Sequence, residues 1–355
     1  MTDATAEITL TLRPTTRFEL INVSKLIREQ CSELLESYRK AVYYSYHTTA
    51  GYLDQKICSR LNYDSESVQA FVKSFQTLFP PDANYQHDRL HLRRELNDEQ
   101  KRDEPRNADA HLTFIGSGLT NFVTYSTSPA VPVYFIDLDG TNGSTRRYRQ
   151  TTIMGIDRET LAGESQLTVP VSGHPVDSVN LKDQRLGLFE RLREQAAMLG
   201  ISRGRISLTL ETDEKDAGLT VNEYETLLMK YDLPEVLDNP LRFMAEKGRH
   251  MLRDPRAVPS KAKEYAKYDL VQLVNQFVDA FGLGESIFER LIDKFIALPA
   301  ARFLRMKRSV NLLVKDAGPN GPEIVQGTYQ SPILVQWRKA AAQRRNLKAS
   351  FVRFE

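Results

Sequence analysis

The sequence is poor in several features that mark whole classes of protein. Only two cysteines and one tryptophan occur in 355 residues, so the chain has neither a disulfide framework nor a cysteine-rich metal knuckle. Its longest apolar runs fall far short of the roughly 20 residues that cross a bilayer, so no membrane partner is expected. The N-terminal residues show no basic and apolar leader, and no secretory signal is expected. We therefore expect a cytoplasmic protein with reduced thiols.

An excess of charge of one sign is also missing. Lys and Arg total 48 against 46 for Asp and Glu, so the overall field gives no argument for a polyanionic partner. Nucleic acid is therefore not expected to bind, whereas a small phosphorylated ligand needs only a few arginine contacts. Apolar residues make up 41% of the chain, which together with its length is enough for two globular cores.

One motif is present twice. Residues 47–51 read His-Thr-Thr-Ala-Gly after the strand-like run 42–46, and residues 217–223 read Ala-Gly-Leu-Thr-Val-Asn-Glu after the strand-like run 206–210. An amphipathic helix pattern precedes each strand-like run. This order of helix, strand and motif indicates an internal duplication.

The duplication predicts the domain organisation. We expect an α+β chain of two tandem, related, β-rich domains of the sandwich or barrel kind, residues 1–162 and 163–355, the second elaborated with helices. The junction is expected in the polar stretch between Gly163 and Gly173, which glycine and proline bound.

Periodicity and breakers predict the individual elements. The N-terminal strands 8–12 and 18–21 are expected to form a hairpin, residues 88–106 an exposed loop or lid, and residues 110–156 a β-rich region. Helices are expected over 23–38, 65–79, 186–199, 221–231, 240–253, 261–281 and 284–297, and C-terminal strands over 310–314, 324–330, 333–335 and 347–352.

Histidines carry the first candidate chemistry. His47, His87 and His111 come from three segments, and Asp88 and Asp109 lie beside two of them. Imidazole can ligate a metal, transfer protons near neutral pH or donate to a phosphate oxygen, and a carboxylate can orient it through its second nitrogen. The alternative is that each histidine satisfies a local loop. We predict that the three converge on one cleft and hold a divalent ion or an anion.

These motifs resemble a family. The segment 47–51, Tyr85 with His87, and residues 107–112 (Asn-Ala-Asp-Ala-His-Leu) occur in the order and spacing of the YjbQ-like proteins, often described as a secondary thiamine-phosphate synthase. The family motif continues with Asn-Glu and closes with Gly-Thr-Trp-Gln. Here the similar pieces, Asn222-Glu223 and residues 327–330 (Gly-Thr-Tyr-Gln), lie in the second half.

The resemblance implies an enzyme that acts on a small phosphorylated substrate, with thiamine-phosphate synthesis as the reaction. It also implies a homo-oligomer and a divalent cofactor, Zn²⁺ or Mg²⁺. The metal ligands would be His47, His87 and His111. The catalytic residues would be His47, Thr48, Asp88, Asp109 and Glu223. The cofactor-binding residues would be Arg146, Arg147, Asn222 and Gln330.

The sequence departs from the family pattern in both halves. Gln55 and Lys56 stand where the first half should have the acidic pair, and the second half has Glu211 or Glu214 where histidine would stand. A site shared between the repeats, with Glu223 facing the histidines, would restore the missing carboxylate. Without such sharing, the chain would be a non-catalytic ligand-binding or assembly protein.

A second motif suggests a different enzyme. Residues 131–141 resemble the first motif of haloacid-dehalogenase-type phosphatases, in which Asp137 would attack phosphorus and Asp139 would act as acid and base. That class needs a helix after the motif, whereas residues 142–166 have a hairpin-like pattern, which favours a plain turn at Asp139.

Overall fold

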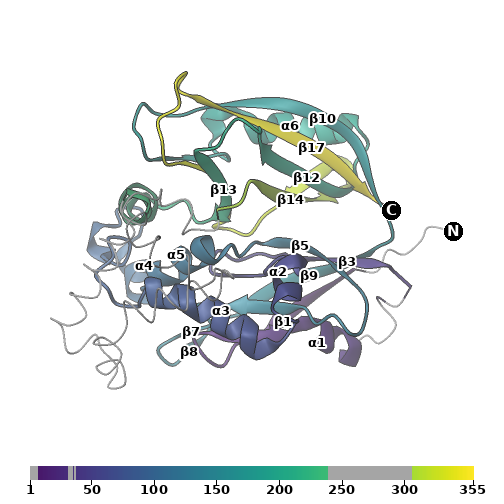
Figure 1. Ribbon diagram of the computed structural model, residues 1–355, viewed down its shortest axis with the longest axis horizontal. Helices are drawn as coiled ribbons and strands as arrows, with labels where there is room; N and C mark the ends of the chain where they lie inside the picture. Colours follow the sequence, from purple (N-terminus) through teal and green to yellow (C-terminus); the bar gives the residue numbers. More distant parts are fainter. Residues whose placement is uncertain (1–6, 31–34, 36, 239–305) are drawn as a thin grey trace, which may run out of the picture. The chain divides into compact units, whose positions relative to one another are not determined.

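The computed structural model describes residues 7–30, 35, 37–238 and 306–355 (Figure 1). The chain forms two compact units. The first contains residues 1–65, 118–224 and 306–355, and the second contains residues 66–117 and 225–305. The helices predicted over 240–253, 261–281 and 284–297 lie outside the described residues, as do Cys31 and His250.

The N-terminal half supplies two antiparallel sheets to the first unit. The larger has the order β1-β9-β3-β5 and the smaller the order β2-β6-β4. Helix α2 (Gln55–Arg60) and a small β7-β8 hairpin complete this half. Its other elements are β1 (Glu7–Leu12), β2 (Glu19–Asn22), α1 (Val23–Gln30), β3 (Lys40–Ser45), β4 (Ala50–Gly51), β5 (Phe122–Ser126), β6 (Tyr134–Asp137), β7 (Thr141–Asn142), β8 (Thr145–Arg146) and β9 (Arg149–Ile156).

The C-terminal half repeats this strand order. Its larger sheet has the order β10-β17-β12-β14-β15 and its smaller sheet the order β11-β16-β13. Apart from the added edge strand β15, each strand has a counterpart at the same place in the first half. The elements are β10 (Glu159–Pro170), β11 (Asp177–Asn180), α6 (Leu188–Met198), β12 (Arg203–Leu210), β13 (Ala217–Asn222), β14 (Ser309–Asp316), β15 (Pro322–Val325), β16 (Ser331–Gln336) and β17 (Arg344–Phe354).

Among the described residues of this unit, apolar side chains form two clusters that position the sheets. One lies within the C-terminal half, where Leu188, Leu192 and Ala196 of α6 recur at helical spacing and pack on the large sheet. The other joins the large sheets of the two halves. It consists of Val42, Tyr44, Phe122, Met154, Ile156, Leu313, Val352 and Phe354.

The second unit is helical where it is described. Helix α3 (Ser65–Leu78) buries the predicted apolar face and ends before Pro80. Between α3 and α5 lie η1 (Leu90–Leu92) and α4 (Asp98–Asp103), whose Asn97 and Gln100 form a capping box. The remaining elements are α5 (Ala108–Ser117), the π-helical turn η3 (Leu228–Asp232) and α7 (Leu233–Asp238).

The predicted α+β fold class with antiparallel, β-rich halves is confirmed, but several local predictions are wrong. Strands β1 and β2 pair with β9 and β6 in different sheets and form no hairpin. Residues 108–117 form a helix rather than the start of a β-rich region. The prediction failed because α5 is buried on all sides, so its sequence shows no amphipathic period. The expected junction at 163–173 is mostly occupied by strand β10.

Two further predictions need adjustment. The stretch 88–106, expected as a loop, contains the short elements η1 and α4. The helix expected over 221–231 begins later, because β13 continues to Asn222.

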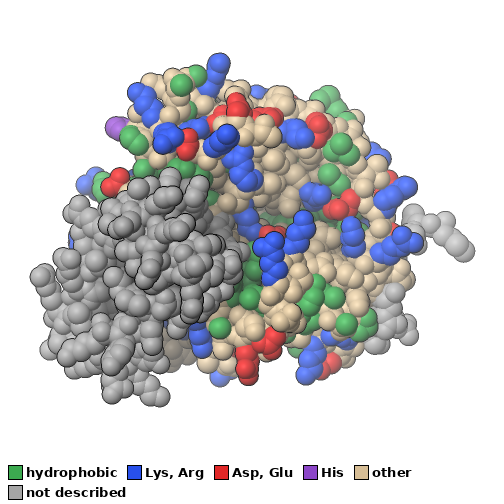
Figure 2. Space-filling model, in the orientation of Figure 1, with side chains coloured by type: hydrophobic (Ala, Val, Ile, Leu, Met, Phe, Trp, Pro, Cys, Tyr) green, Lys and Arg blue, Asp and Glu red, His purple; other side chains and the backbone are tan. Residues whose placement is uncertain are grey.

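Among the described residues, no helix is both long enough and apolar enough to span a membrane. Lys and Arg side chains predominate on the face that Figure 2 shows, with Asp and Glu side chains between them.

Candidate functional site

The loop from Tyr46 to Thr49, here called the His47 loop, joins β3 to β4 in the first unit. Its backbone carbonyls are bound by side-chain amides from distant segments. Asn121 donates to the carbonyl oxygens of Ser45 (3.3 Å) and His47. Gln330 donates to the same two oxygens, at 2.8 and 3.0 Å. Amides from both halves therefore fix the backbone of this loop.

Gln330 uses all its hydrogen-bonding capacity in this way. Its Oε1 accepts from the Tyr44 hydroxyl (2.9 Å) and from the Gly327 amide (2.9 Å), and the side chain is only 1% exposed. A Cβ on Gly327 would lie 1.8 Å from the Tyr46 carbonyl oxygen, so only glycine fits there. Gln330 thus holds the turn 327–330 against the His47 loop. Its predicted part in cofactor binding stays a prediction.

Asn222 has a similar part. Its Nδ2 donates to the carbonyl oxygen of Thr48 at 3.0 Å, and its Oδ1 accepts from the Glu223 amide at 2.8 Å. The asparagine is fully buried. Asn222 of the second half therefore contacts the His47 loop of the first half. A site shared between the repeats, with Glu223 facing the histidines, stays a prediction.

The His47 ring is neutral and has a defined tautomer. Its Nε2 accepts from the backbone amide of Gln150 at 2.7 Å. Burial, together with the positive charges of Arg149 and Arg147, lowers the pKa of His47 from 6.5 to about 3. Because the Nε2 lone pair is used, the single proton of the ring is assigned to Nδ1. In this arrangement His47 offers a donor, and neither nitrogen offers a lone pair to a metal.

Two buried carboxylates anchor the arginines beside this ring. Arg149 donates to both oxygens of Asp137, at 2.7 and 2.9 Å, and to the Asp139 carbonyl at 2.7 Å. Arg147 forms an ion pair with the Asp139 carboxylate at 2.7 Å and remains partly exposed. Burial raises the pKa of Asp137, although Arg149 opposes that shift. Arg149 was not among the predicted site residues.

These ion pairs give no support to the phosphatase interpretation. Arg149 occupies both oxygens of Asp137, and Asp137 and Asp139 are fully buried. The motif also leads into the β7-β8 hairpin rather than into a helix. A nucleophilic carboxylate needs a free oxygen that faces its substrate.

The second half contains an equivalent position, identified from the strand register. Asp137 pairs with Ala50, and Gln336 pairs with Ala217, the alanines of the two motif copies. Arg149 binds Asp137, and Arg345 donates to Gln336 at 3.3 Å. Asp137 and Gln336 thus correspond, as do the two arginines.

Glu214 takes the place of His47 in this copy. Its Oε1 accepts from the backbone amide that follows Arg345, that of Asn346, at 2.8 Å. His47 accepts in the same way from Gln150, which follows Arg149. Glu214 also accepts from Arg345 at 2.8 Å and is 7% exposed. Of the two glutamates considered from the sequence, Glu214 therefore stands at the histidine position.

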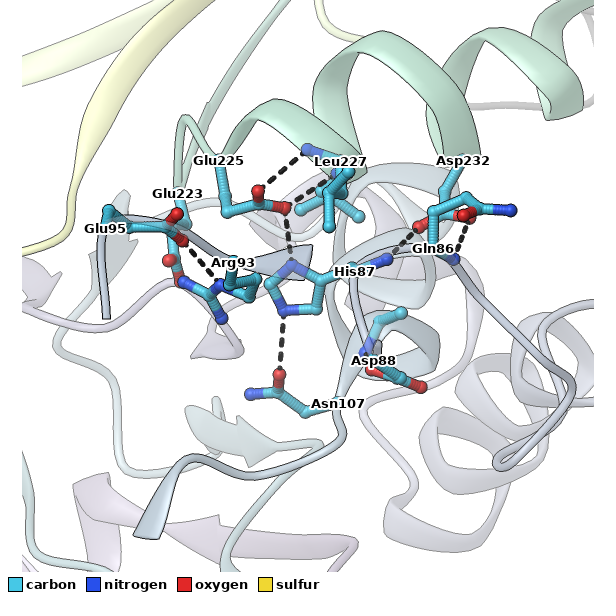
Figure 3. A network of polar contacts seen from close by, with 12 residues as sticks. Gln86, His87, Asp88, Arg93, Glu95, Asn107, Glu223, Glu225, Leu227 and Asp232 are labelled. Carbon is cyan, nitrogen blue, oxygen red and sulfur yellow. Dashed lines mark hydrogen bonds and ion pairs between the residues drawn. The ribbon is translucent and has the colours of Figure 1, made fainter. Parts of the chain in front are cut away.

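The second unit contains another polar network, shown in Figure 3. His87 donates from Nδ1 to the Glu225 carboxylate at 2.8 Å, and its Nε2 lies 3.2 Å from Asn107 Oδ1. The ring of His111 packs edge-on against His87, with 5.2 Å between the ring centroids. All four side chains are buried, so His87 ties the segment around residue 87 to the segment that begins at residue 225.

Carboxylates in this network also cap backbone amides. Glu225 accepts from the amides of Leu227 (2.7 Å) and Leu228 (2.8 Å). Burial works to raise the pKa of Glu225, but the hydrogen bonds from His87 and from these amides outweigh it, and the pKa is lowered. Asp232 accepts from the amides of Gln86 and His87, at 2.8 and 2.9 Å (Figure 3).

Asp88 and Asp109 lie in the same unit. Asp88 accepts from the Ala108 amide at 3.0 Å, at the start of α5. Asp109 is buried in the first turn of that helix. Burial, and then the negative charges of Asp109 and Asp88, raise the pKa of Tyr85 well above 10. The two aspartates thus lie near the histidine pair, and Asp88 acts as a helix cap.

The structure brings some predicted residues together and separates others. His87, His111, Asp88 and Asp109 belong to the second unit, whereas His47 belongs to the first. The convergence of all three histidines therefore stays a prediction. Among the described residues, no group of three or more His, Cys, Asp or Glu side chains is arranged to hold a metal ion. Arg146 is exposed in the β7-β8 hairpin.

Four residues that position these sites were missed: Asn121, Arg149, Glu225 and Asp232. Glu225 stands before an apolar helical stretch, but glutamate is not one of the residues typical of an N-terminal cap, so the sequence holds little indication of its part. Arg149 lies two residues after Arg147, in the same basic run as the predicted Arg146 and Arg147, and could have been included with them. Asn121 and Asp232 act across long sequence separations and left no local signal.

Comparisons with known proteins found similarity at the level of structure. No protein-family model and no curated protein matches the chain. A solved YbjQ-like protein of unknown function from Sulfolobus solfataricus P2 is 13% identical, with a TM-score of 0.29, and the match covers 55% of this chain and 99% of that protein. A hypothetical protein from Aeropyrum pernix K1 is 14% identical, with a TM-score of 0.27, over 54% of this chain and 98% of that protein.

A third solved protein, described as an uncharacterized conserved protein of the yjbq/upf0047 family from Clostridium acetobutylicum, is 12% identical, with a TM-score of 0.25. The match covers 53% of this chain and 98% of that protein. None of these three descriptions names a substrate or an activity.

Proposed function

We propose that the chain is an enzyme that acts on a small phosphorylated substrate at the His47 loop. The observation that carries this proposal is the state of His47: a neutral imidazole whose one proton lies on Nδ1, fixed on a loop that three amides hold, beside Arg147. Because the pKa of His47 is lowered to about 3, the ring can donate to a phosphate oxygen near neutral pH without changing charge.

This arrangement suits a reaction in which negative charge develops on a leaving phosphate or pyrophosphate. A prepositioned N–H donor and a partly exposed guanidinium stabilise such charge without rearrangement during the reaction. Arg146, exposed nearby in the sequence, would extend the cationic surface. His47 would not act as a general base, because a base needs a pKa close to the working pH and a free lone pair.

Thiamine-phosphate synthesis, which the sequence resemblance implies, is the first reaction to assay. Joining an alkyl group with loss of pyrophosphate asks the protein mainly to position two partners and to stabilise the departing charge. Glu223 follows Asn222, whose side chain anchors the loop, and in this proposal its carboxylate would face the second partner.

The predicted divalent ion does not fit the described geometry as a three-histidine site. His47 accepts a backbone hydrogen bond at Nε2, and both nitrogens of His87 have protein partners. Zinc requires an unprotonated nitrogen from each histidine, so these bonds would have to break. Metal binding stays a prediction that elemental analysis of the purified protein tests.

The repeated strand order and the matching positions of His47 and Glu214 support a tandem duplication. In this history, the first half kept the histidine and lost the acidic pair, whereas the second half kept Asn222-Glu223. Association into homo-oligomers, as the resemblance implies, stays a prediction that light scattering would test.

The alternative is a ligand-binding or assembly protein without catalysis. It draws on Gln55, which uses its side chain to bind the Ser126 amide and the Tyr63 hydroxyl (both 3.2 Å), while Lys56 is exposed. Gln55 thus has a structural part, and Lys56 adds a positive charge at the surface. The side-chain amides of Asn222 and Gln330 are also bonded to backbone carbonyls of the His47 loop or beside it.

A matched pair of variants tests the proposal. Binding of thiamine phosphate and of inorganic pyrophosphate is measured by calorimetry for the wild type, His47→Gln and Glu214→Gln. We expect His47→Gln to weaken binding about tenfold, the effect of losing one hydrogen bond to a charged group, and Glu214→Gln to leave it unchanged. Equal losses in both variants, or no binding by the wild type, would contradict the proposal.

A coupled assay for thiamine phosphate then separates the two functions. The enzyme should lose activity in His47→Gln, while the thermal unfolding midpoint reports whether the variant is folded. Binding with no turnover in the wild type would favour the non-catalytic alternative.

A further inference from the structure

Tyr329 is an exposed aromatic residue on the turn 327–330, with 68% of its surface accessible. The next residue, Gln330, has its side chain buried and bonded to the carbonyls of Ser45 and His47. Tyr329 is therefore one residue away from the group that anchors the His47 loop. An isolated exposed ring is common on protein surfaces, so the importance of Tyr329 depends on how the turn is held.

The turn is held at both ends. Gln330 donates its backbone amide to the Gly327 carbonyl (3.1 Å), and the Gly327 amide returns a bond to Gln330 Oε1 (2.9 Å). Gly327 lies against the Tyr46 backbone so closely that no side chain fits. The fixed backbone removes the cost of ordering the turn when a ligand binds, and a tyrosine side chain has only two rotatable bonds to order.

A second exposed tyrosine provides a contrast. Tyr148, beside Arg149, is 64% exposed, but the Arg13 guanidinium lies over its ring at 4.9 Å from the centroid. In the part of the chain that the structure describes, Tyr329 makes no such ring or cation contact. Of the two, only Tyr329 presents an unoccupied aromatic face.

We propose that Tyr329 is a specificity-determining residue, whose ring stacks on a planar heteroaromatic ring of the phosphorylated ligand. This inference rests on the proposed function, in which His47 and Arg147 receive the phosphate. The two groups divide the ligand between them. The basic end selects phosphate, and the tyrosine selects ligands that carry a flat ring, since stacking on an aromatic side chain contributes to affinity for any such ring.

The test compares ligands with and without a ring. Calorimetry measures thiamine phosphate and inorganic pyrophosphate against the wild type, Tyr329→Ala, Tyr329→Phe and the control Tyr148→Ala. We expect Tyr329→Ala to weaken thiamine phosphate about tenfold, within the range for loss of one stacking contact, and to leave pyrophosphate unchanged. Tyr329→Phe, which keeps the ring, should bind both ligands within about twofold of the wild type.

The outcomes separate this inference from the proposed function. If the wild type binds pyrophosphate but Tyr329→Ala binds thiamine phosphate normally, only the stacking proposal fails. The same holds if Tyr329→Ala weakens both ligands equally, or if Tyr148→Ala has the same ring-selective effect. If the wild type binds neither ligand, the proposed function fails and the stacking proposal fails with it. Thermal unfolding midpoints within about 2 °C of the wild type show that each variant is folded.

Discussion

The His47 loop and its counterpart around Glu214 lie at the same place in two sheets of the same strand order, yet they solve one problem differently. Each loop presents a side chain to a backbone amide near the start of the last strand, at 2.7 Å for His47 and 2.8 Å for Glu214. The histidine remains neutral and partly exposed, whereas the glutamate is buried in an ion pair with Arg345. The first loop keeps an N–H donor for a ligand, whereas both oxygens of the glutamate in the second loop are bonded within the protein.

The arginines explain the difference. In the first half, Asp137 takes the charge of Arg149, which leaves His47 without a carboxylate to bind. In the second half, the position of Asp137 is held by the neutral Gln336, and Glu214 supplies the negative charge that Arg345 requires. The last residue of the central strand of the small sheet is thus an acid in the first half, Asp137, and an amide in the second half, Gln336. With the acid, the side chain of the loop is free of the arginine, and with the amide, the loop glutamate pairs with the arginine.

The largest effect should come from breaking the buried pair of the second loop. Arg345→Met leaves the Glu214 carboxylate buried without its cation, which should cost about 3–5 kcal/mol of unfolding free energy. Urea unfolding measures it. Arg338→Met, at an exposed arginine of the same region, should change stability by no more than about 0.5 kcal/mol. Similar values for the two variants would show that the second loop does not depend on this pair.

A smaller effect is expected where the first loop depends on an amide. Gln330→Glu keeps the acceptor for Tyr44 and Gly327 but removes both donors to the His47 loop, and should cost about 1–3 kcal/mol. Gln166→Ala, at an exposed position in β10, is the control in the same urea series and should be neutral. If Gln330→Glu unfolds like the wild type, the loop is not held from the second half.

The smallest effect concerns pH and belongs to the first loop alone. The His47 ring takes up a proton near pH 6.5 in the unfolded chain but only near pH 3 in the folded protein. The unfolded state therefore binds more protons in this window, and stability falls as the pH drops from about 6.5 toward 3. Between pH 7 and 5 the loss should be on the order of 1 kcal/mol, reduced by the partial exposure of the ring. His47→Gln should lack this part of the pH dependence, and equal pH profiles for the two proteins would contradict a neutral, buried imidazole.

Sequence reasoning succeeded where the signal was local. The apolar spacing in α3 and α6 and the β-branched and aromatic residues of β3 and β12 place these elements within a few residues. Helix α5 was missed because a short apolar run buried on all sides has no period to distinguish helix from strand. The pairing of β1 and β2 with different sheets depends on contacts more than 100 residues away in sequence, which no local pattern encodes.

The candidate site shows the same division. The motif residues His47, Asn222 and Gln330 were found from the sequence, and the structure gathers them at one loop. Their parts were not predicted, because whether an amide binds a ligand or a carbonyl depends on which backbone groups the fold brings to it. Glu214 could be narrowed to two candidates by alignment of the motif copies, and only the register of β16 and β17 decided between them.

The second unit has a consequence for how the protein is made. It consists of two insertions, one between β4 and β5 and the other between β13 and β14, at equivalent places in the two halves. His87 and Gln86 find their partners Glu225 and Asp232 more than 130 residues later. During synthesis from the N-terminus, the first insertion is therefore made before these partners, which follow more than 100 residues after its end. A polypeptide that ends near residue 224 would contain every histidine of the family-like motifs and still be unable to complete the unit to which two of them belong.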